Sequence, residues 1–234
     1  AFRFTIAAVC LGIISCKKFK LMNRSYWLHG AILGFFLFMG YLVQTIGCNY
    51  TTAGKNAFLT TIYVILIPLI SWPLYKKRPA WYVFAAAVMS VTGIGLLALN
   101  NTDGSLLNMN VGDILTLTCG FFFAIHIIFV AKWNEHEDPI LLTVLQFAFA
   151  ALFGWIIAPF IKNTGVNGPF PLEQLKNVKV VLSMFYLGIF STMIAFFLQN
   201  VCLKYVPFVI SLLYKFYKKL PPFFCSIFLL QNSV

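Results

Sequence analysis

Long apolar runs separated by short polar stretches form the pattern of this chain. The runs are unbroken, whereas strands of a membrane barrel would alternate apolar and polar positions. Crossing a bilayer as a helix takes about 20 mostly apolar residues. The pattern therefore predicts an all-α integral membrane protein with about eight transmembrane helices. The expected helices are residues 2–15, 28–48, 57–74, 81–99, 114–131, 140–161, 180–203 and 206–230.

Composition agrees with this pattern. Hydrophobic residues make up 61% of the chain and charged residues only 10%, whereas soluble domains are about half apolar. The six cysteines lie mostly in apolar runs, without CxxC or zinc-like Cys/His spacing, so they are interpreted as small hydrophobic residues. No metal, cofactor or catalytic residue is expected.

The net charge of +11 comes from basic residues gathered between apolar runs, notably at 17–24 and 76–78. This distribution favours the positive-inside rule over a nucleic-acid partner. Two expected spans separate these loops, so both should lie on the cytoplasmic side. The acidic turn at 135–138 should lie there too, and the polar loops at 100–113 and 162–179 should lie outside.

A weak internal repeat also runs through the chain. RFTIAAVCLGII, beginning at Arg3, resembles QFAFAALFGWII, beginning at Gln146, and Gln44 has a counterpart in Gln199. Apolar sequences often match by chance, but both matches occur in the same order. An odd number of spans separates the partners, so the two halves would be inverted, as in many secondary transporters.

Three stretches resemble the EamA-type transporters of the drug/metabolite transporter superfamily. They are YTTAGKNAFLTTIYVILIPLIS from Tyr50, GDILTLTCGFFFAIHIIFVAKW from Gly112, and DPILLTVLQFAFAALF from Asp138. The resemblance implies ten spans in two inverted five-helix halves. Residues 1–100 would be spans 2–5 of the first half and residues 111–234 spans 6–9 of the second. The chain would then be a fragment without the first and last spans.

The resemblance further implies a central cavity formed mainly by runs 28–48, 57–74, 180–203 and 206–230. The last run departs from the family pattern because it carries lysines in its middle. Those lysines indicate either a degraded end or a cationic site for an anionic substrate. They are Lys215, Lys218 and Lys219.

Each candidate site residue has a functional and a structural interpretation. Gln44 and Gln199 could bind substrate or join helices, since buried amides in lipid need partners. Lys55 could attract an anion near a helix N-terminus or extend to the interface. Asn56 could be a ligand or a helix cap.

His126 could carry a proton for coupling or be a neutral, hydrogen-bonded residue. Tyr63, with Trp155, could line a cavity for an aromatic or polar metabolite or fill the core. Gln146 is expected to join helices, and Arg3 to reach the interface. Every Asp and Glu is expected in a loop, so no carboxylate relay inside the membrane is expected. The candidate substrate-binding residues are Gln44, Lys55, Asn56, Tyr63, His126 and Gln199.

These features predict a secondary transporter that moves a small metabolite, amino acid or drug-like compound by alternating access. Its expected partners are the small-molecule substrate and the lipid bilayer, with a homodimer as a further expectation. Its expected location is the cell membrane, as a multi-pass protein of a bacterial inner membrane. The alternatives are a membrane-embedded enzyme, for which no HExxH or GxSxG motif is present, and a non-transporting assembly partner.

Overall fold

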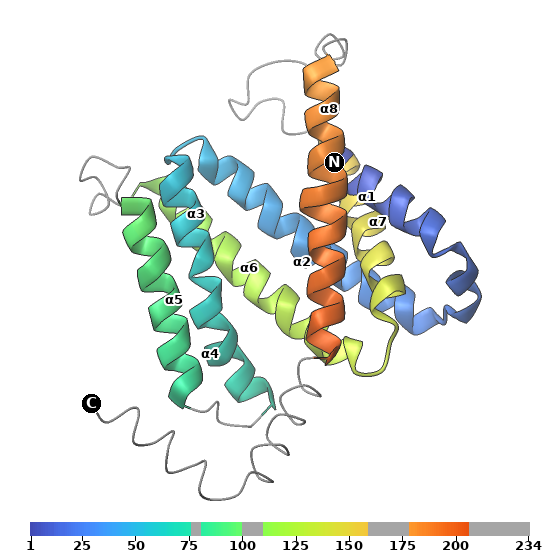
Figure 1. Cartoon of the computed structure of the whole chain (residues 1–234), viewed down its shortest axis with the longest axis horizontal. Coiled ribbons are helices and arrows are strands. Elements are labelled where there is room, and N and C mark those ends of the chain that lie inside the picture. Colours follow the sequence, from blue (N-terminus) through green and yellow to red (C-terminus); the bar gives the residue numbers. More distant parts are fainter. Residues whose placement is uncertain (76–80, 100–109, 159–177, 206–234) are drawn as a thin grey trace, which may run out of the picture.

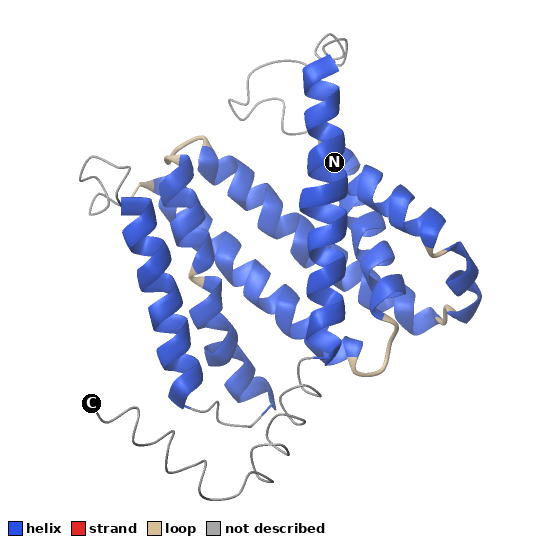
Figure 2. Ribbon diagram, in the orientation of Figure 1, coloured by secondary structure: helices blue, strands red, loops and turns tan. Residues whose placement is uncertain are grey.

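The computed structural model describes residues 1–75, 81–99, 110–158 and 178–205, whose regular elements are all helices (Figure 2). A 3₁₀ helix follows α1, a π helix follows α8, and residues 195–205 continue the last helix. The elements are α1 (Phe2–Ile14), the 3₁₀ helix η1 (Cys16–Leu21), α2 (Arg24–Cys48), α3 (Ala53–Thr61), α4 (Tyr63–Tyr75), α5 (Trp81–Leu99), α6 (Val111–Asn134), α7 (Pro139–Ile157), α8 (Val178–Tyr186) and the π helix η5 (Leu187–Ile194).

The all-helical membrane architecture is confirmed for the described residues. Five helical segments there are long and apolar enough to cross a membrane, and α1 is a shorter apolar helix. The eighth expected run, 206–230, lies outside the described residues, as do the lysines within it. The five segments are Arg24–Cys48, Gly54–Leu74, Val111–Asn134, Pro139–Ile157 and Val181–Tyr205.

The third expected helix is wrong in one respect, because it is divided at Ile62 into α3 and α4. The hydroxyls of Thr60 and Thr61 donate to the carbonyls four residues earlier, each at 2.8 Å. Such back-bonding often bends helices. Pro68 inside α4 also has no N–H to donate and crowds the preceding turn.

Helix α2 lies at the centre of the bundle, packed between α6 and α7. Helices α3, α4 and α5 lie on the α6 side of α2, and α1 lies on the α7 side (Figure 1). Close approach at Gly47 and Gly112 joins α2 to an antiparallel α6, whereas Gly30 and Gly34 meet a parallel α7. Small residues permit this close packing of helices in lipid.

The outer surface is apolar. In α5, Trp81 is 79% exposed and Met89 is 75% exposed. Large apolar side chains on an outer face would be unfavourable in water, but they suit a helix surrounded by hydrocarbon. The buried core lies instead where α2 and α7 meet, around Leu37 and Phe147.

The first basic run and the acidic turn lie at the same end of the bundle, as the number of spans predicts. Lys18 Nζ in η1 is 2.7 Å from Asp138 Oδ2, just before α7. His29 Nδ1 lies 2.6 Å from Glu137 Oε1, and Lys204 Nζ donates to the Glu137 carbonyl at 3.2 Å. The second basic run, 76–78, lies outside the described residues.

Candidate functional site

A partly open cavity of about 410 Å³, the interior cavity, lies among the helices of the bundle. It collects side chains from α1, α2, α3, α4, α6, η5 and residues 195–205. Four predicted site residues are among them, namely Gln44, Tyr63, His126 and Gln199. The full lining is Arg3, Tyr41, Gln44, Thr60, Tyr63, Phe123, His126, Ile127, Ser191, Phe196 and Gln199.

Gln44 lines the cavity and is held there by a hydrogen bond to Thr60, near the end of α3. It lies near the C-terminal end of α2, and its Nε2 donates to Thr60 Oγ1 at 3.2 Å. Thr60 Oγ1 in turn donates to the Asn56 carbonyl at 2.8 Å. Because the Gln44 amide has two N–H groups and an acceptor oxygen, it retains hydrogen-bonding capacity beyond this contact.

His126 occupies the cavity wall from the middle of α6. Its side chain is 1% exposed, and its Nε2 lies 3.0 Å from Oε1 of the equally buried Gln146 in α7. With Nε2 protonated, the neutral ring donates to this amide oxygen. The Phe196 ring meets the imidazole edge-on at 6.3 Å between centroids, which fixes the ring plane.

Arg3 is a lining residue that sequence reasoning missed. Its guanidinium carbon lies 3.7 Å from the centre of the Tyr41 ring, within the range of a cation–π contact. Both side chains line the cavity, and the expectation that Arg3 reaches the membrane interface stays a prediction. The repeat contained a signal, because Arg3 is the counterpart of Gln146, so both halves carry a polar residue at this position.

Lys55 and Asn56 belong to a polar cluster beside the cavity rather than to its lining. Lys55 Nζ lies 2.6 Å from Asp113 Oδ2, and both side chains are buried. Asn56 Nδ2 donates to Thr116 Oγ1 at 3.2 Å and to the Gln44 carbonyl at 3.4 Å. The helix cap is Thr52, whose hydroxyl accepts from the Lys55 N–H, so the capping interpretation of Asn56 is wrong.

The expectation that every carboxylate lies in a loop is wrong for Asp113. It stands in the first turn of α6, fully buried. Its side chain accepts from the Asn110 N–H and from the Thr51 hydroxyl, each at 2.8 Å. Asn110 and Asp113 form a capping box, a pattern that marks a helix start. This spacing could have placed the start of α6 earlier in the chain.

Trp155 does not line the cavity, so the cavity-lining interpretation of this residue is wrong. It is 40% exposed on α7, and its Nε1 donates to Thr5 Oγ1 at 3.1 Å.

A neighbouring cavity of about 590 Å³ extends towards Cys48 and Ala158, and it shares Arg3, Tyr41 and Gln44 with the first. Arg3 therefore contacts both spaces.

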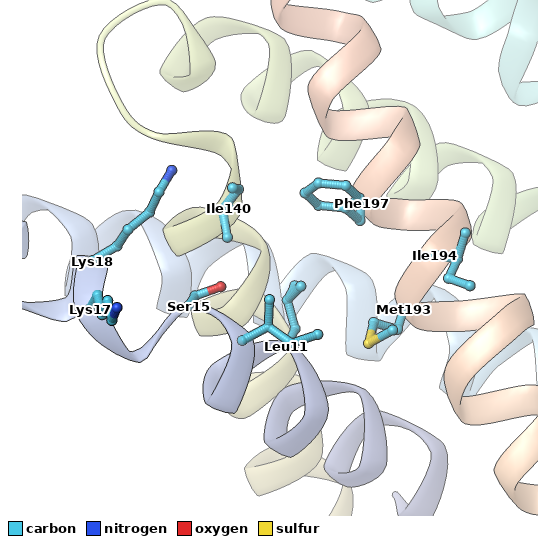
Figure 3. Close-up of a pocket in the computed structure, with 9 residues that line it drawn as sticks. Leu11, Ser15, Lys17, Lys18, Ile140, Met193, Ile194 and Phe197 are labelled. Atoms are coloured by element: carbon cyan, nitrogen blue, oxygen red, sulfur yellow. The ribbon is translucent and has the colours of Figure 1, made fainter.

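A third cavity, of about 440 Å³, lies at the end of the bundle that holds the acidic turn. Apolar residues of η5 and the following helix form one side, and the η1 lysines form the other (Figure 3). Lys18 there is already paired with Asp138. This cavity contains none of the predicted site residues.

Long apolar helices around an interior cavity define a multi-pass integral membrane protein. The sequence matches the EamA-like transporter family over residues 1–99 and 110–233, and the chain belongs to that family.

Three relatives are themselves named only as uncharacterized transporters. One from Archaeoglobus fulgidus is 34% identical over 175 residues, covering 73% of this chain and 51% of the relative. A second from that organism is 25% identical, covering 74% and 58%. The transporter YvbV of Bacillus subtilis is 23% identical, covering 64% and 50%. The chain spans about half the length of these curated relatives.

Proposed function

We propose that this protein is a secondary transporter that carries a small metabolite, amino acid or drug-like compound by alternating access. The observation that carries the proposal is the interior cavity, where Gln44 and Gln199, 155 residues apart, line one space. Its volume of about 410 Å³ falls within the usual range for small-molecule sites. Membership of the EamA-like family supports the same conclusion.

The directions of the helices support two inverted halves, at residues 1–100 and 111–234. Helices α1 and α7, predicted counterparts, are antiparallel, since Ala1 lies beside Gly154 and Gly12 beside Val144. Helix α2 and the helix at 178–205 are also antiparallel, with Tyr41 near Phe196 and Leu33 in one cluster with Leu203. Inverted halves can exchange conformations, which is how alternating access arises.

Within this proposal the candidate residues have different tasks. Gln44, Tyr63, His126 and Gln199 would contact the substrate. Lys55 has a carboxylate partner, Asp113, at 2.6 Å, so it would join α3 to α6 beside the cavity. Asn56 would act in the same cluster. The described residues contain no group of His, Cys, Asp and Glu suited to a metal, and no specific observation favours a membrane enzyme.

Flux measurements on the full chain in proteoliposomes test this function. The panel would contain labelled amino acids, nucleobases, sugars and aromatic acids, each measured as gradient-driven uptake and as counterflow exchange. Ser191→Trp should abolish flux because it fills the cavity. Phe190→Trp is the matched control, since the neighbouring Phe190 is 59% exposed and does not line the cavity. Absence of flux across the panel would refute the proposal.

A further inference from the structure

Among the described residues that line the interior cavity, one carries a permanent charge, the guanidinium of Arg3. None of the lining residues is an Asp or Glu, and among the described residues no carboxylate lies within 4 Å of Arg3 to form an ion pair. The Tyr41 ring covers one face of the guanidinium. The Tyr41 side chain also hydrogen-bonds with Arg3, but a neutral phenol neither balances the charge nor occupies all five N–H donors of an arginine.

The other buried or partly buried charges in this region already have partners. Lys55 is paired with Asp113, and His29 lies against Glu137 at the far end of α2. A cation facing a cavity in a low-dielectric interior is costly unless an anion accompanies it. Arg3 therefore differs from Lys55 and His29, because no carboxylate among the described residues accompanies it.

The uncharged residues that line the cavity indicate which chemical groups a ligand should carry besides an anion. Aromatic rings from α2, α4, α6 and the last helix line the space. The Tyr41 ring meets Phe123 edge-on and Phe196 at a tilt. Gln44 and Gln199 provide neutral donors and acceptors. A planar, compact apolar group fits among the rings, and a carboxylate fits the fork of an arginine in a bidentate arrangement.

We infer that the cavity takes a small organic anion, an aromatic carboxylate, with Arg3 as the residue that binds its carboxylate. This inference rests on the proposed transport function and names its substrate class. The contacts with Tyr41 hold the guanidinium at the cavity wall, and a single phenol leaves further N–H donors of the arginine for a carboxylate. Arg3 also borders the neighbouring cavity, so it meets a carboxylate at the boundary between the two spaces.

Equilibrium binding to the full chain in nanodiscs at pH 7 tests the inference with two probes of equal shape, benzoate and benzamide. The wild-type protein should bind benzoate at least about tenfold more tightly than benzamide, because only benzoate can make a charge-assisted contact with the guanidinium. Arg3→Gln should abolish this preference, and Arg3→Lys should retain part of it, since lysine keeps the charge but loses the fork. Arg24→Gln removes an exposed arginine at the start of α2 and should leave the preference unchanged.

Several results would overturn the inference: a benzoate preference that survives Arg3→Gln, benzamide binding as tight as benzoate binding, or no binding of either probe at millimolar concentration. These results are separable from failure of the transport function. Flux of neutral compounds that is insensitive to Arg3→Gln would leave transport standing and remove the anion assignment. An Arg3-dependent benzoate preference without flux would remove transport and leave the binding site.

Discussion

At the scale of single residues, the side chains of His126 and Gln146 join α6 to α7. Both side chains are almost fully buried, and one hydrogen bond of 3.0 Å joins them. Gln146→Leu would leave His126 Nε2 without its acceptor in an apolar interior. We expect this variant to lose about 1–3 kcal/mol of stability, measured by unfolding in a detergent titration.

The double variant His126→Phe/Gln146→Leu is the control, because replacing both partners with apolar groups leaves no unpaired polar atom. It should be more stable than Gln146→Leu alone. Equal loss from Gln146→Leu in the wild-type and His126→Phe backgrounds would show that the two side chains are not coupled.

The pair of Lys55 and Asp113 leads to a second prediction. Both groups are buried, 2.6 Å apart, so Lys55→Met would leave the Asp113 carboxylate without its cation. The expected loss is about 3–5 kcal/mol, measured by the same detergent titration. Lys55→Met/Asp113→Asn should recover part of that loss, since no unpaired charge then remains. A neutral effect of Lys55→Met would mean that the pair does not join α3 to α6.

The sequence allowed the polar lining of the cavity to be predicted better than its charges. Gln44, His126 and Gln199 stand out because each is a polar residue near or within a long apolar run, and such residues usually face the bundle interior. Arg3 was assigned to the interface because its environment depends on how α1 packs on α2, and no local pattern encodes that packing. The ion pair of Asp113 likewise joins helices that are distant in sequence.

At the scale of helices, the glycines of α2 determine how closely it approaches α7. A methyl group at Gly34 would lie 2.5 Å from Phe149 Cβ and 2.9 Å from the Gln146 carbonyl oxygen. Because one of these neighbours is backbone, the helices would have to separate. Gly34→Ala should therefore destabilise the protein by about 1–3 kcal/mol, measured as a lower unfolding midpoint in detergent.

Gly93→Ala is the matched control for this prediction. It makes the same chemical change within α5, where nothing lies within 4 Å of the added methyl group. Alanine is a better helix former than glycine by up to about 1 kcal/mol, so this variant should be unchanged or slightly more stable. If both variants behaved alike, helix propensity rather than close packing would govern Gly34.

Most of the helices are predictable from the sequence, because a helix that crosses hydrocarbon has to be about 20 residues long and mostly apolar. The expected run 81–99 coincides with α5. The division at Ile62 was not predicted, since it depends on threonine hydroxyls bonding within the helix. The helix expected at 114–131 begins three residues later than α6, because a carboxylate such as Asp113 is expected in a loop, whereas its capping box with Asn110 begins the helix.

At the scale of the whole molecule, contacts between distant segments close one end of the bundle. Lys18, Ser25, His29 and Lys204 all converge on the turn that holds Glu137 and Asp138. They join η1, α2 and the last helix to the start of α7. Alternating access in the proposed transporter would require some of these contacts to break when this end opens.

Asp138 makes this end of the bundle sensitive to pH. Partial burial would raise the pKa of Asp138, but hydrogen bonds from Lys18 and the Ile140 N–H, with the charges of Lys18 and Lys204, outweigh burial and hold the pKa below its usual range. Because the folded-state pKa is depressed, the stability that the ionised Asp138 contributes is fully present above the unfolded pKa of about 3.9. That contribution is lost as the pH falls through the lower, folded-state pKa.

Asp138→Asn should therefore be less stable than the wild type at pH 7, and the difference should disappear as the pH falls below about 3.9. Asparagine caps a helix about as well as aspartate, so the variant isolates the charge. The Lys18 side chain is 42% exposed and solvent screens the pair, which limits the effect to about 0.2–1 kcal/mol. Thermal unfolding in detergent between pH 3 and 7 measures it, with Lys17→Gln as the control for an exposed, neighbouring lysine. A stability difference that stayed constant across this range would show that the Asp138 charge does not contribute to stability.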